Sequence, residues 1–191
     1  GGRERPKGWA YDRWWVLAEA GMEGGMAWVL GDGPIGITDV GSTSGPGLAS
    51  KDVIDLQVAV RRLSDCDAPE FVKALADMGF PRIEGNDQDV VHSWAPDPAS
   101  WAKRFHGSAD PGRVVHLHVR EHGSSGWESA LLFRDWLVAH PAERDDYADL
   151  KRVLAHRESA LPEYSSAKEP WIASALLRAR AWARETGWMA R

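Results

Sequence analysis

Two segments in which apolar and polar residues alternate place the strongest constraint on this chain. In residues 53–60 (VIDLQVAV), every second side chain from position 54 onward is apolar. In residues 113–120 (RVVHLHVR), the apolar side chains at positions 115, 117 and 119 alternate with polar ones. A period of two residues indicates a β-strand whose two faces differ chemically. We therefore expect two strands that each turn one apolar face toward helices and the opposite face away from them.

Shorter patterns predict the elements around these strands. Residues 35–40 (IGITDV) are typical of a short strand, and weak strand character surrounds residues 90–91. Residues 101–107 (WAKRFHG) are expected to pair with residues 113–120 in a hairpin. Its turn would lie at residues 110–112 (DPG), because proline and glycine favour turn conformations.

Helical spacing of apolar residues predicts helices at both ends of the chain and one between the strands. Residues 14–30 resemble a helix that glycines interrupt. Asp67, followed by Pro69, is expected to begin a helix that ends at Gly79.

The region after residue 120 is predicted to be helical. Residues 127–140 and 143–159 form two helices in this interpretation, and a last helix has Pro170 in or near its first turn. Strands and helices are mixed without strict alternation. The fold class is therefore α+β (mixed α/β): a mixed sheet backed by helices, with a helical C-terminal part.

Composition narrows the class of protein further. The 191 residues fit a single domain over residues 1–191, of which residues 1–8 are expected to be loosely ordered. No apolar run approaches the roughly 18 residues of a transmembrane helix, so no membrane partner is expected. A net charge of −5 argues against a general attraction to nucleic acid, although a local basic pocket stays open.

Cysteine and tryptophan bear on the location and the core. Cys66 is the single cysteine, which excludes an intramolecular disulfide and favours a reducing, cytoplasmic location. No cysteine-nucleophile signature surrounds it, so its expected role is structural. The 11 tryptophans lie mostly within apolar helical patterns and are expected to fill the core.

A turn of small residues is the first candidate for chemistry. Gly41, Ser42, Thr43 and Ser44 follow the predicted strand at 35–40. Backbone N–H groups and hydroxyls in such a turn can bind a phosphate, although a plain turn explains the same residues. The lysine-containing ending of a P-loop is absent from this segment.

Four polar residues on the two alternating strands are the second candidate. Asp55 and Gln57 share one face of their strand, and His116 and His118 share one face of theirs. If the strands are neighbours, the four groups converge. Carboxylate and amide oxygens suit Mg²⁺ or Mn²⁺ and imidazoles suit Zn²⁺, while a solvated strand face and a surface histidine pair are the plainer alternatives.

Basic residues near these elements are candidate phosphate ligands, although ordinary solvated charge explains any one of them equally well. The set consists of Lys51, Lys103, Arg104, Arg113 and Lys168.

Several ordered blocks of the sequence resemble the GrpB family over roughly residues 35–180. They include Tyr147 with Leu150-Lys151, and the blocks VGSTSGPGLASKDVIDLQV, KRFHGSADPGRVVHLHV, LLFRDWLVAHP and YSSAKEPW. The late blocks look particularly like the GrpB-type domain that follows dephospho-CoA kinase in actinobacteria. The sequence therefore resembles either that appended domain or a free-standing relative of it.

The resemblance implies a nucleotidyltransferase-like fold with a Gly-Ser turn followed by an acid-x-acid pair on the next strand. Gly41-Ser42 matches the turn and Asp55 matches the first acid, whereas Gln57 stands at the second. The later strand that would supply a third acid offers His116 and His118 instead. Asp39, two residues before the turn, is a candidate for the missing metal-binding charge.

Two functions follow from this resemblance. In the first, the protein binds ATP or another nucleoside triphosphate with a divalent metal and transfers a nucleotidyl group to an acceptor. Asp55, His116 and His118 are then the catalytic candidates, and Asp55, Gln57, His116, His118 and Asp39 are the metal-ligand candidates. In the second, it is a non-catalytic accessory domain that assists a kinase domain, since the second carboxylate is missing.

Overall fold

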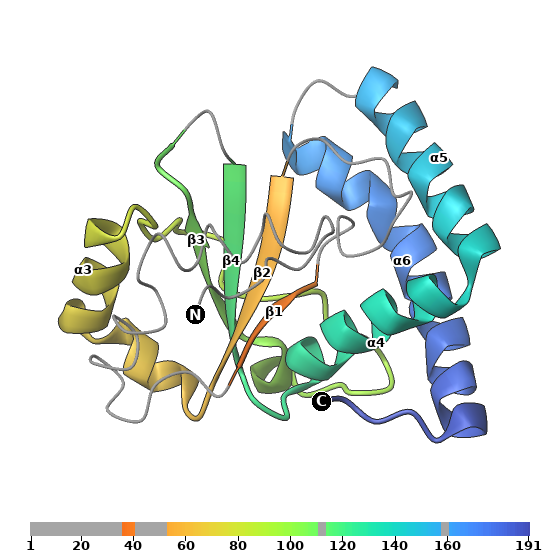
Figure 1. Ribbon diagram of the computed structural model, residues 1–191, viewed down its shortest axis with the longest axis horizontal. Coiled ribbons are helices and arrows are strands. Elements are labelled where there is room, and N and C mark those ends of the chain that lie inside the picture. The colour runs from red at the N-terminus through yellow and green to blue at the C-terminus, as the bar shows by residue number, and fades with distance from the viewer. Residues whose placement is uncertain (1–35, 41–52, 111–113, 158–160) are drawn as a thin grey trace, which may run out of the picture.

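A single four-stranded mixed sheet organises the part of the chain that the computed structural model describes, namely residues 36–40, 53–110, 114–157 and 161–191. Its order is β1-β2-β4-β3, with the two central strands β2 and β4 parallel and each edge strand antiparallel to its neighbour. The strands are β1 (Gly36–Asp39), β2 (Val53–Val60), β3 (Lys103–Gly107) and β4 (Val114–Glu121). The two alternating segments are therefore confirmed as neighbouring strands (Figure 1).

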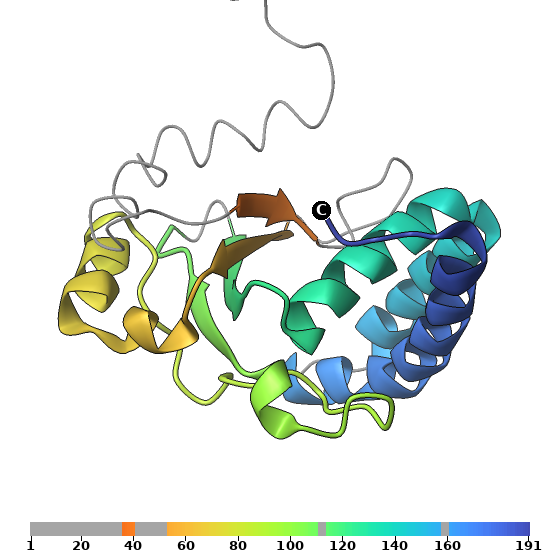
Figure 2. The same cartoon turned by 90° about the horizontal axis from the view of Figure 1, so that it is seen from below.

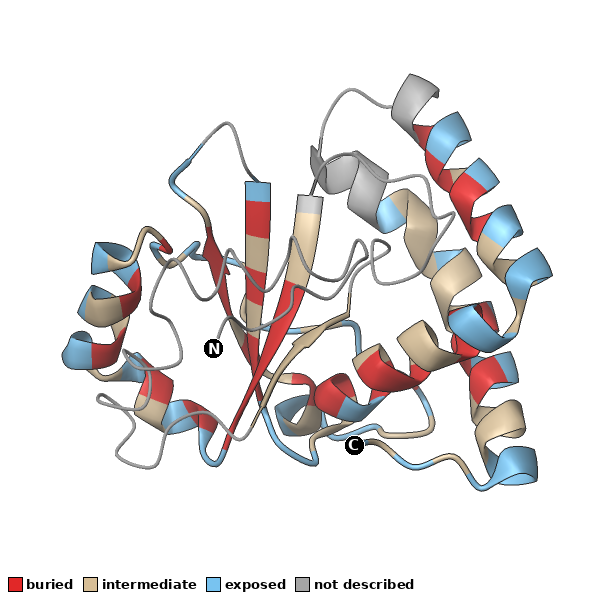
Figure 3. Ribbon diagram, in the orientation of Figure 1, coloured by how far each residue is buried: buried red, intermediate tan, exposed pale blue. Residues whose placement is uncertain are grey.

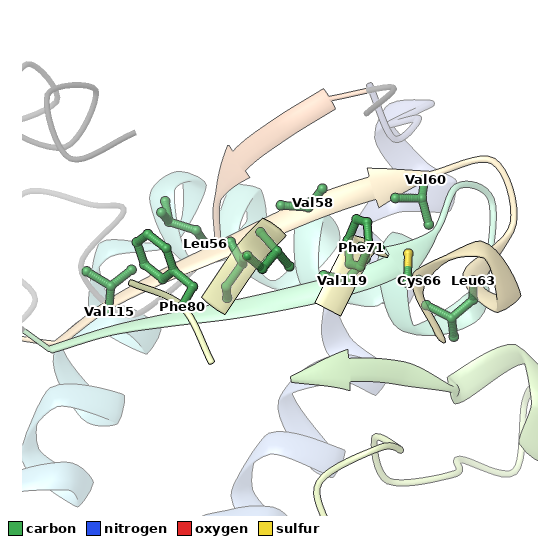
Figure 4. Close-up of a cluster of buried hydrophobic side chains, with 11 residues drawn as sticks. Leu56, Val58, Val60, Leu63, Cys66, Phe71, Phe80, Val115 and Val119 are labelled. Carbon is green, nitrogen blue, oxygen red and sulfur yellow. The ribbon is translucent and has the colours of Figure 1, made fainter. Parts of the chain in front are cut away.

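One face of the sheet packs against the 3₁₀ helix η1 (Leu63–Asp67) and the helix α3 (Pro69–Asp77). Apolar side chains from alternate positions of both central strands meet Phe71 and Leu75 of α3 there (Figure 4). The buried cluster consists of Leu56, Val58, Val60, Leu63, Cys66, Phe71, Leu75, Phe80, Val115, Leu117 and Val119. This core fixes the register, because a shift of one residue would bury the polar face instead.

The opposite face of the sheet meets the C-terminal helices (Figure 2). These are α4 (Ser125–Ala139), α5 (Pro141–Arg157) and α6 (Leu161–Thr186), and the short η2 (Pro98–Trp101) precedes β3. Trp127 and Leu131 of α4 pack on Ala59 of β2, and farther from the sheet the three helices share a second core. Buried positions in Figure 3 accordingly appear on the strands and on the inner sides of these helices.

The start of α3 differs from the sequence prediction. Ala68 is the residue that precedes the first turn, and no side chain caps the helix there. Pro69 lies in the first turn as predicted. Asp67 instead ends η1 and binds Arg82 and Arg104, which explains why it does not cap α3. The helix ends at Asp77, and Gly79 follows two residues later with a positive φ of 88° that suits glycine, close to the expected end.

Two other sequence predictions are wrong. Pro170 lies inside α6 and not near its first turn, because that helix begins at Leu161. Val90 and Val91 form no strand and are both exposed. The edge of β3 is covered instead by residues 81–89, which donate and accept backbone hydrogen bonds along it.

The predictions for residues 1–8, for the helix at 14–30 and for the turns at 41–44 and 111–112 lie outside the described residues. No helix in the described ranges combines the length and the apolarity that crossing a bilayer requires.

Cys66 and several tryptophans occupy the core, as the composition predicts. Cys66 is fully buried, and burial together with Asp67 raises the pKa of its thiol to about 12, so it is not a nucleophile. Trp101, Trp127 and Trp136 are also buried.

Gly126, in the first turn of α4, provides a stability test of the contact between this helix and the sheet. A Cβ atom at this position would lie 2.9 Å from Oδ2 of Asp89 and 3.4 Å from Nε of Arg120. We expect Gly126→Ala to lower the free energy of unfolding by about 1–2 kcal/mol, because the steric cost exceeds the helix-propensity gain. Urea unfolding followed by tryptophan fluorescence measures this change.

Gly36 provides the matched control for that substitution, because a Cβ atom there meets nothing within 4 Å. Gly36→Ala should leave the unfolding midpoint unchanged or slightly raised. Equal midpoints for the two variants would contradict the close packing of α4 against the Asp89–Arg120 pair.

Candidate functional site

Four polar side chains lie on the face of the sheet opposite the α3 core. The parallel register of β2 and β4 pairs Asp55 with His116 and Gln57 with His118. Their apolar neighbours at alternate positions are held in the core, so the same alternation that builds the core presents these four groups on the other face. We call this surface the polar face.

Asp55 is the centre of the polar face. Its Oδ1 atom lies 3.2 Å from Nδ1 of His116 and 3.5 Å from Nε2 of His118. Burial by itself raises the pKa of Asp55, but the hydrogen bonds to the two imidazoles outweigh burial and hold this pKa well below its usual range. The carboxylate is therefore ionised at neutral pH and accepts a hydrogen bond from each ring.

The two histidines use opposite ring nitrogens toward Asp55. His118 presents Nε2, and its Nδ1 is buried and has no hydrogen-bond partner in the described part of the chain. Burial lowers the pKa of His118 to about 4, so this ring is neutral at pH 7. His116 presents Nδ1, which leaves Nε2 on the side of the ring that faces away from the carboxylate. About a third of the His116 side chain is exposed, at 35%.

Phe105 of β3 holds both imidazoles in place. Its ring centroid lies 5.1 Å from that of His116 and 5.0 Å from that of His118, with tilted planes in both pairs. The antiparallel register places Phe105 directly opposite His118. An aromatic ring packed against both imidazoles restricts their rotation and lowers the local polarity.

Both polar atoms of the Gln57 side chain are occupied by hydrogen bonds to neighbouring residues. Its Oε1 accepts a hydrogen bond of 2.8 Å from Arg120, and its Nε2 lies 3.4 Å from the carbonyl oxygen of Trp127. The side chain is fully buried. The role of Gln57 as a metal ligand stays a prediction, and the bond from Arg120 to its oxygen does not favour it.

A buried ion-pair network lies beside these residues. Asp89 accepts hydrogen bonds from Arg120 at 2.7 and 3.1 Å and from Lys103 at 2.8 Å. Lys103 was expected to bind phosphate, but its buried ammonium group is paired with Asp89. The sequence patterns missed both Asp89 and Arg120. Asp89 lies in an irregular segment that no pattern marks. Arg120 could have been found, because the period of two places it on the same face as His116 and His118.

Two further predicted residues lie on the other face of the sheet. Asp39 pairs with Leu56 in the antiparallel register, so its side chain points to the α3 side and cannot supply the missing charge beside Asp55. Arg104 pairs with Val119 and binds Asp67 at 2.6 Å through two nitrogens. Neither residue joins the polar face, so their roles as metal and phosphate ligands stay predictions from the sequence.

Lys151 of α5 interacts electrostatically with Asp55 on the polar face, and Lys168 of α6 interacts with Lys151. The pKa of Lys151 is lowered to about 8, because burial and the charge of Lys168 lower it more than the charge of Asp55 raises it. Nζ of Lys151 lies 5.0 Å from the centre of the Tyr147 ring. The half-buried Glu169 interacts with Lys168, Asp89 and Lys103, and burial raises its pKa. Lys168 interacts with Lys151, and its phosphate-binding role stays a prediction, whereas Lys151 is a residue that the list of candidates lacked.

The remaining candidates lie outside the described residues. They are Gly41, Ser42, Thr43, Ser44, Lys51 and Arg113. Their contribution to phosphate binding stays a prediction from the sequence.

The fit of the polar face to a divalent metal is poor. Both imidazoles direct a ring N–H toward the same carboxylate oxygen, whereas metal ligands direct lone pairs toward a common point. Oε1 of Gln57 already accepts a hydrogen bond from Arg120, and Asp39 lies on the other face of the sheet. Among the described residues, no three His, Cys, Asp or Glu side chains are arranged to hold a metal ion. We therefore derive no chemical step through a metal bound by these residues.

The mixed sheet, with a helix-packed core on one face and a polar face under the C-terminal helices, defines the class of fold as α+β. A crystal structure of the GrpB protein from Enterococcus faecalis matches this fold with a TM-score of 0.65 and 20% identity, over 88% of this chain and 95% of that one. The family model for GrpB protein matches residues 10–178. The chain therefore belongs to the GrpB family.

Curated relatives of the chain fall into two groups. A dephospho-CoA kinase of Mycolicibacterium paratuberculosis is 42% identical over 80% of this chain and 40% of the kinase. A UPF0157 protein of Halalkalibacterium halodurans is 33% identical over 80% of this chain and 71% of that protein. The chain thus spans well under half the length of the kinases that it matches.

Proposed function

We propose that the polar face binds a nucleoside triphosphate, with MgATP as the first candidate, and that the protein is nucleotidyltransferase-like. The observation that carries this proposal is the Asp55–His116–His118 cluster, in which one ionised carboxylate orients two imidazoles on a single face. Such groups are typical of sites at which protons or phosphoryl groups are transferred.

The charge around this cluster supports an anionic ligand. Lys103 and Arg120 together carry two positive charges, which the carboxylates of Asp89 and Asp55 balance. Lys151 and Lys168 add positive charge from the helices. Although the whole chain has a net charge of −5, this region has a local excess of cations that phosphate oxygens would neutralise.

The reaction class that we propose is the transfer of a nucleotidyl group. We do not name the acceptor molecule. Magnesium enters here with the nucleotide, as part of the substrate MgATP. The family resemblance also predicts a metal ion, Mg²⁺, Mn²⁺ or Zn²⁺, that is held by the protein itself. The described residues lend little support to that prediction.

Calorimetric titration with MgATP tests the proposed binding. We expect saturable heat with the wild-type chain and at least about tenfold weaker binding for Lys168→Glu, since a charge-assisted contact contributes about 1.5–3 kcal/mol. Lys73→Glu is the matched control, because Lys73 lies on α3, on the other side of the sheet, and is exposed. Repeating the titration with MnATP, and with ZnCl₂ alone, tests the metal prediction separately.

An absence of heat with the wild-type chain would refute nucleotide binding. Equal losses of affinity in Lys168→Glu and Lys73→Glu would place the nucleotide somewhere other than the polar face.

A second function, as an accessory domain of a dephospho-CoA kinase, rests on a different observation. The kinases at 40–42% identity match this chain over only 40% of their own length, so most of each kinase lies outside the matched part. We propose the kinase domain of such a protein as the partner. Co-expression should raise the soluble yield of that kinase domain, and the gain should persist in Lys168→Glu if the effect is independent of the nucleotide.

A further inference from the structure

The geometry of His116 separates the functions of its two ring nitrogens. Nδ1 is held at 3.2 Å from Oδ1 of Asp55, and because this carboxylate is ionised, Nδ1 carries the ring proton. In the neutral ring, Nε2 is then an unprotonated nitrogen with its lone pair directed away from Asp55. The His116 side chain is 35% exposed, about twice the exposed fraction of His118, which is 16%.

His118 does not share this geometry, although it lies on the same strand and contacts the same carboxylate. Its side chain is 16% exposed, and the nitrogen that faces away from Asp55 is buried. The structure therefore distinguishes two histidines that the sequence pattern treats as equivalent. His118 contacts Asp55 from a buried position, whereas His116 is the more exposed of the two rings.

From this geometry we infer that His116 is a covalent nucleophile that accepts a nucleotidyl group on Nε2. The inference rests on the proposed binding of a nucleoside triphosphate and goes beyond it by naming the attacking atom and the intermediate. Histidine is an established nucleophile in group transfer, and a neighbouring carboxylate that holds the other nitrogen activates it.

The first half of the reaction balances as follows. The Nε2 lone pair attacks the α-phosphorus and forms an N–P bond, while the bond from this phosphorus to the bridging oxygen breaks and pyrophosphate leaves. The proton stays on Nδ1, so the substituted ring is a cation that Asp55 neutralises. No oxidant or reductant is required.

In the second half, water or an acceptor hydroxyl attacks the same phosphorus. The N–P bond breaks, its electron pair returns to Nε2, and the proton of the attacking group passes to solvent. Cationic groups near the polar face, including Lys151, would stabilise the negative charge on the phosphate oxygens during both halves. His116 is regenerated in its original tautomer.

Radiolabelled ATP tests this inference directly. The full chain is incubated with MgATP labelled at the α-phosphorus, quenched in denaturant and separated from free nucleotide. We expect up to one label per chain, stable in base and lost in acid, as is typical of an N–P bond. Intact mass spectrometry should show the added mass of one nucleotidyl group.

Two variants identify the modified atom. His116→Asn keeps a hydrogen-bond donor near the position of Nδ1 but removes Nε2, so it should lose the label while retaining its fold by circular dichroism. His122→Gln is the control, because His122 is an exposed histidine in the turn after β4 and should keep the label.

Each outcome has a distinct meaning. If calorimetry shows that MgATP binds to the wild-type chain but no label is retained, the covalent role of His116 is refuted and the proposed binding stands. If MgATP does not bind, the proposed function itself fails. Label retained by His116→Asn, or label that comes from the γ-phosphorus instead of the α-phosphorus, would also overturn the inference.

Discussion

Asp89→Asn is expected to lower the free energy of unfolding by about 3–5 kcal/mol, which is the typical cost of leaving a buried charge without its partner. Asp89 is the common acceptor for Arg120 and Lys103, whose side chains are each only 7% exposed. Removing the carboxylate charge leaves two buried cations facing a neutral amide. The pKa of Asp89 agrees with this dependence: burial raises it, but the two cations hold it well below its usual range.

Urea unfolding followed by tryptophan fluorescence measures the effect, with Asp77→Asn as the matched control. Asp77 forms an ion pair with Lys73 on the surface of α3, and both side chains are more than half exposed. Such pairs contribute about 0–1 kcal/mol, so the control should unfold close to the wild-type midpoint. Similar midpoints for the two variants would mean that the Asp89 network is not a structural support of the polar face.

Nucleotide affinity is expected to fall as the pH rises through the pKa of Lys151. This pKa is lowered to about 8, first by burial and then by the charge of Lys168. A bound phosphate favours the charged ammonium form, so affinity is highest where Lys151 is protonated, below about pH 8. We expect at least about a tenfold loss of MgATP affinity between about pH 7 and pH 9.5, equivalent to about 1.4 kcal/mol.

Lys151→Met tests this assignment, because methionine keeps much of the packing against Tyr147 but removes the charge. This variant should bind MgATP more weakly at pH 7 and should show a nearly flat pH profile. Lys73→Met, on the other side of the sheet, should retain the wild-type profile. A wild-type affinity that is constant over this pH range, or an unchanged profile in Lys151→Met, would remove Lys151 from the site.

The polar face could be predicted because it depends on a simple periodicity. The alternation in residues 53–60 and 113–120 defines which side chains share a face, and it places Asp55 beside His116 once the strands are neighbours. The α+β class and the family follow from the same blocks of sequence. Local periodicity carries this information because a one-residue shift would exchange the buried and exposed faces.

Other parts of the site depend on contacts that periodicity does not encode. Asp89 lies in an irregular segment, and its partners are fixed only when that segment lies along the edge of β3. The face on which Asp39 lies does not follow from the sequence, because it depends on the register of β1 against β2. Lys151 interacts electrostatically with Asp55 only because α5 packs near the sheet, and a helical pattern alone does not place a helix relative to a sheet.

Histidine ring signals in NMR spectra provide the most direct test of the central claim that the polar face is the ligand site. Titration of the full chain with MgATP should shift the ring signals of His116 and His118, assigned with single-histidine variants, and should leave those of His122 unchanged. Saturable shifts in these two rings would agree with the geometry around Asp55. Binding detected by calorimetry without any shift in either ring would contradict the account.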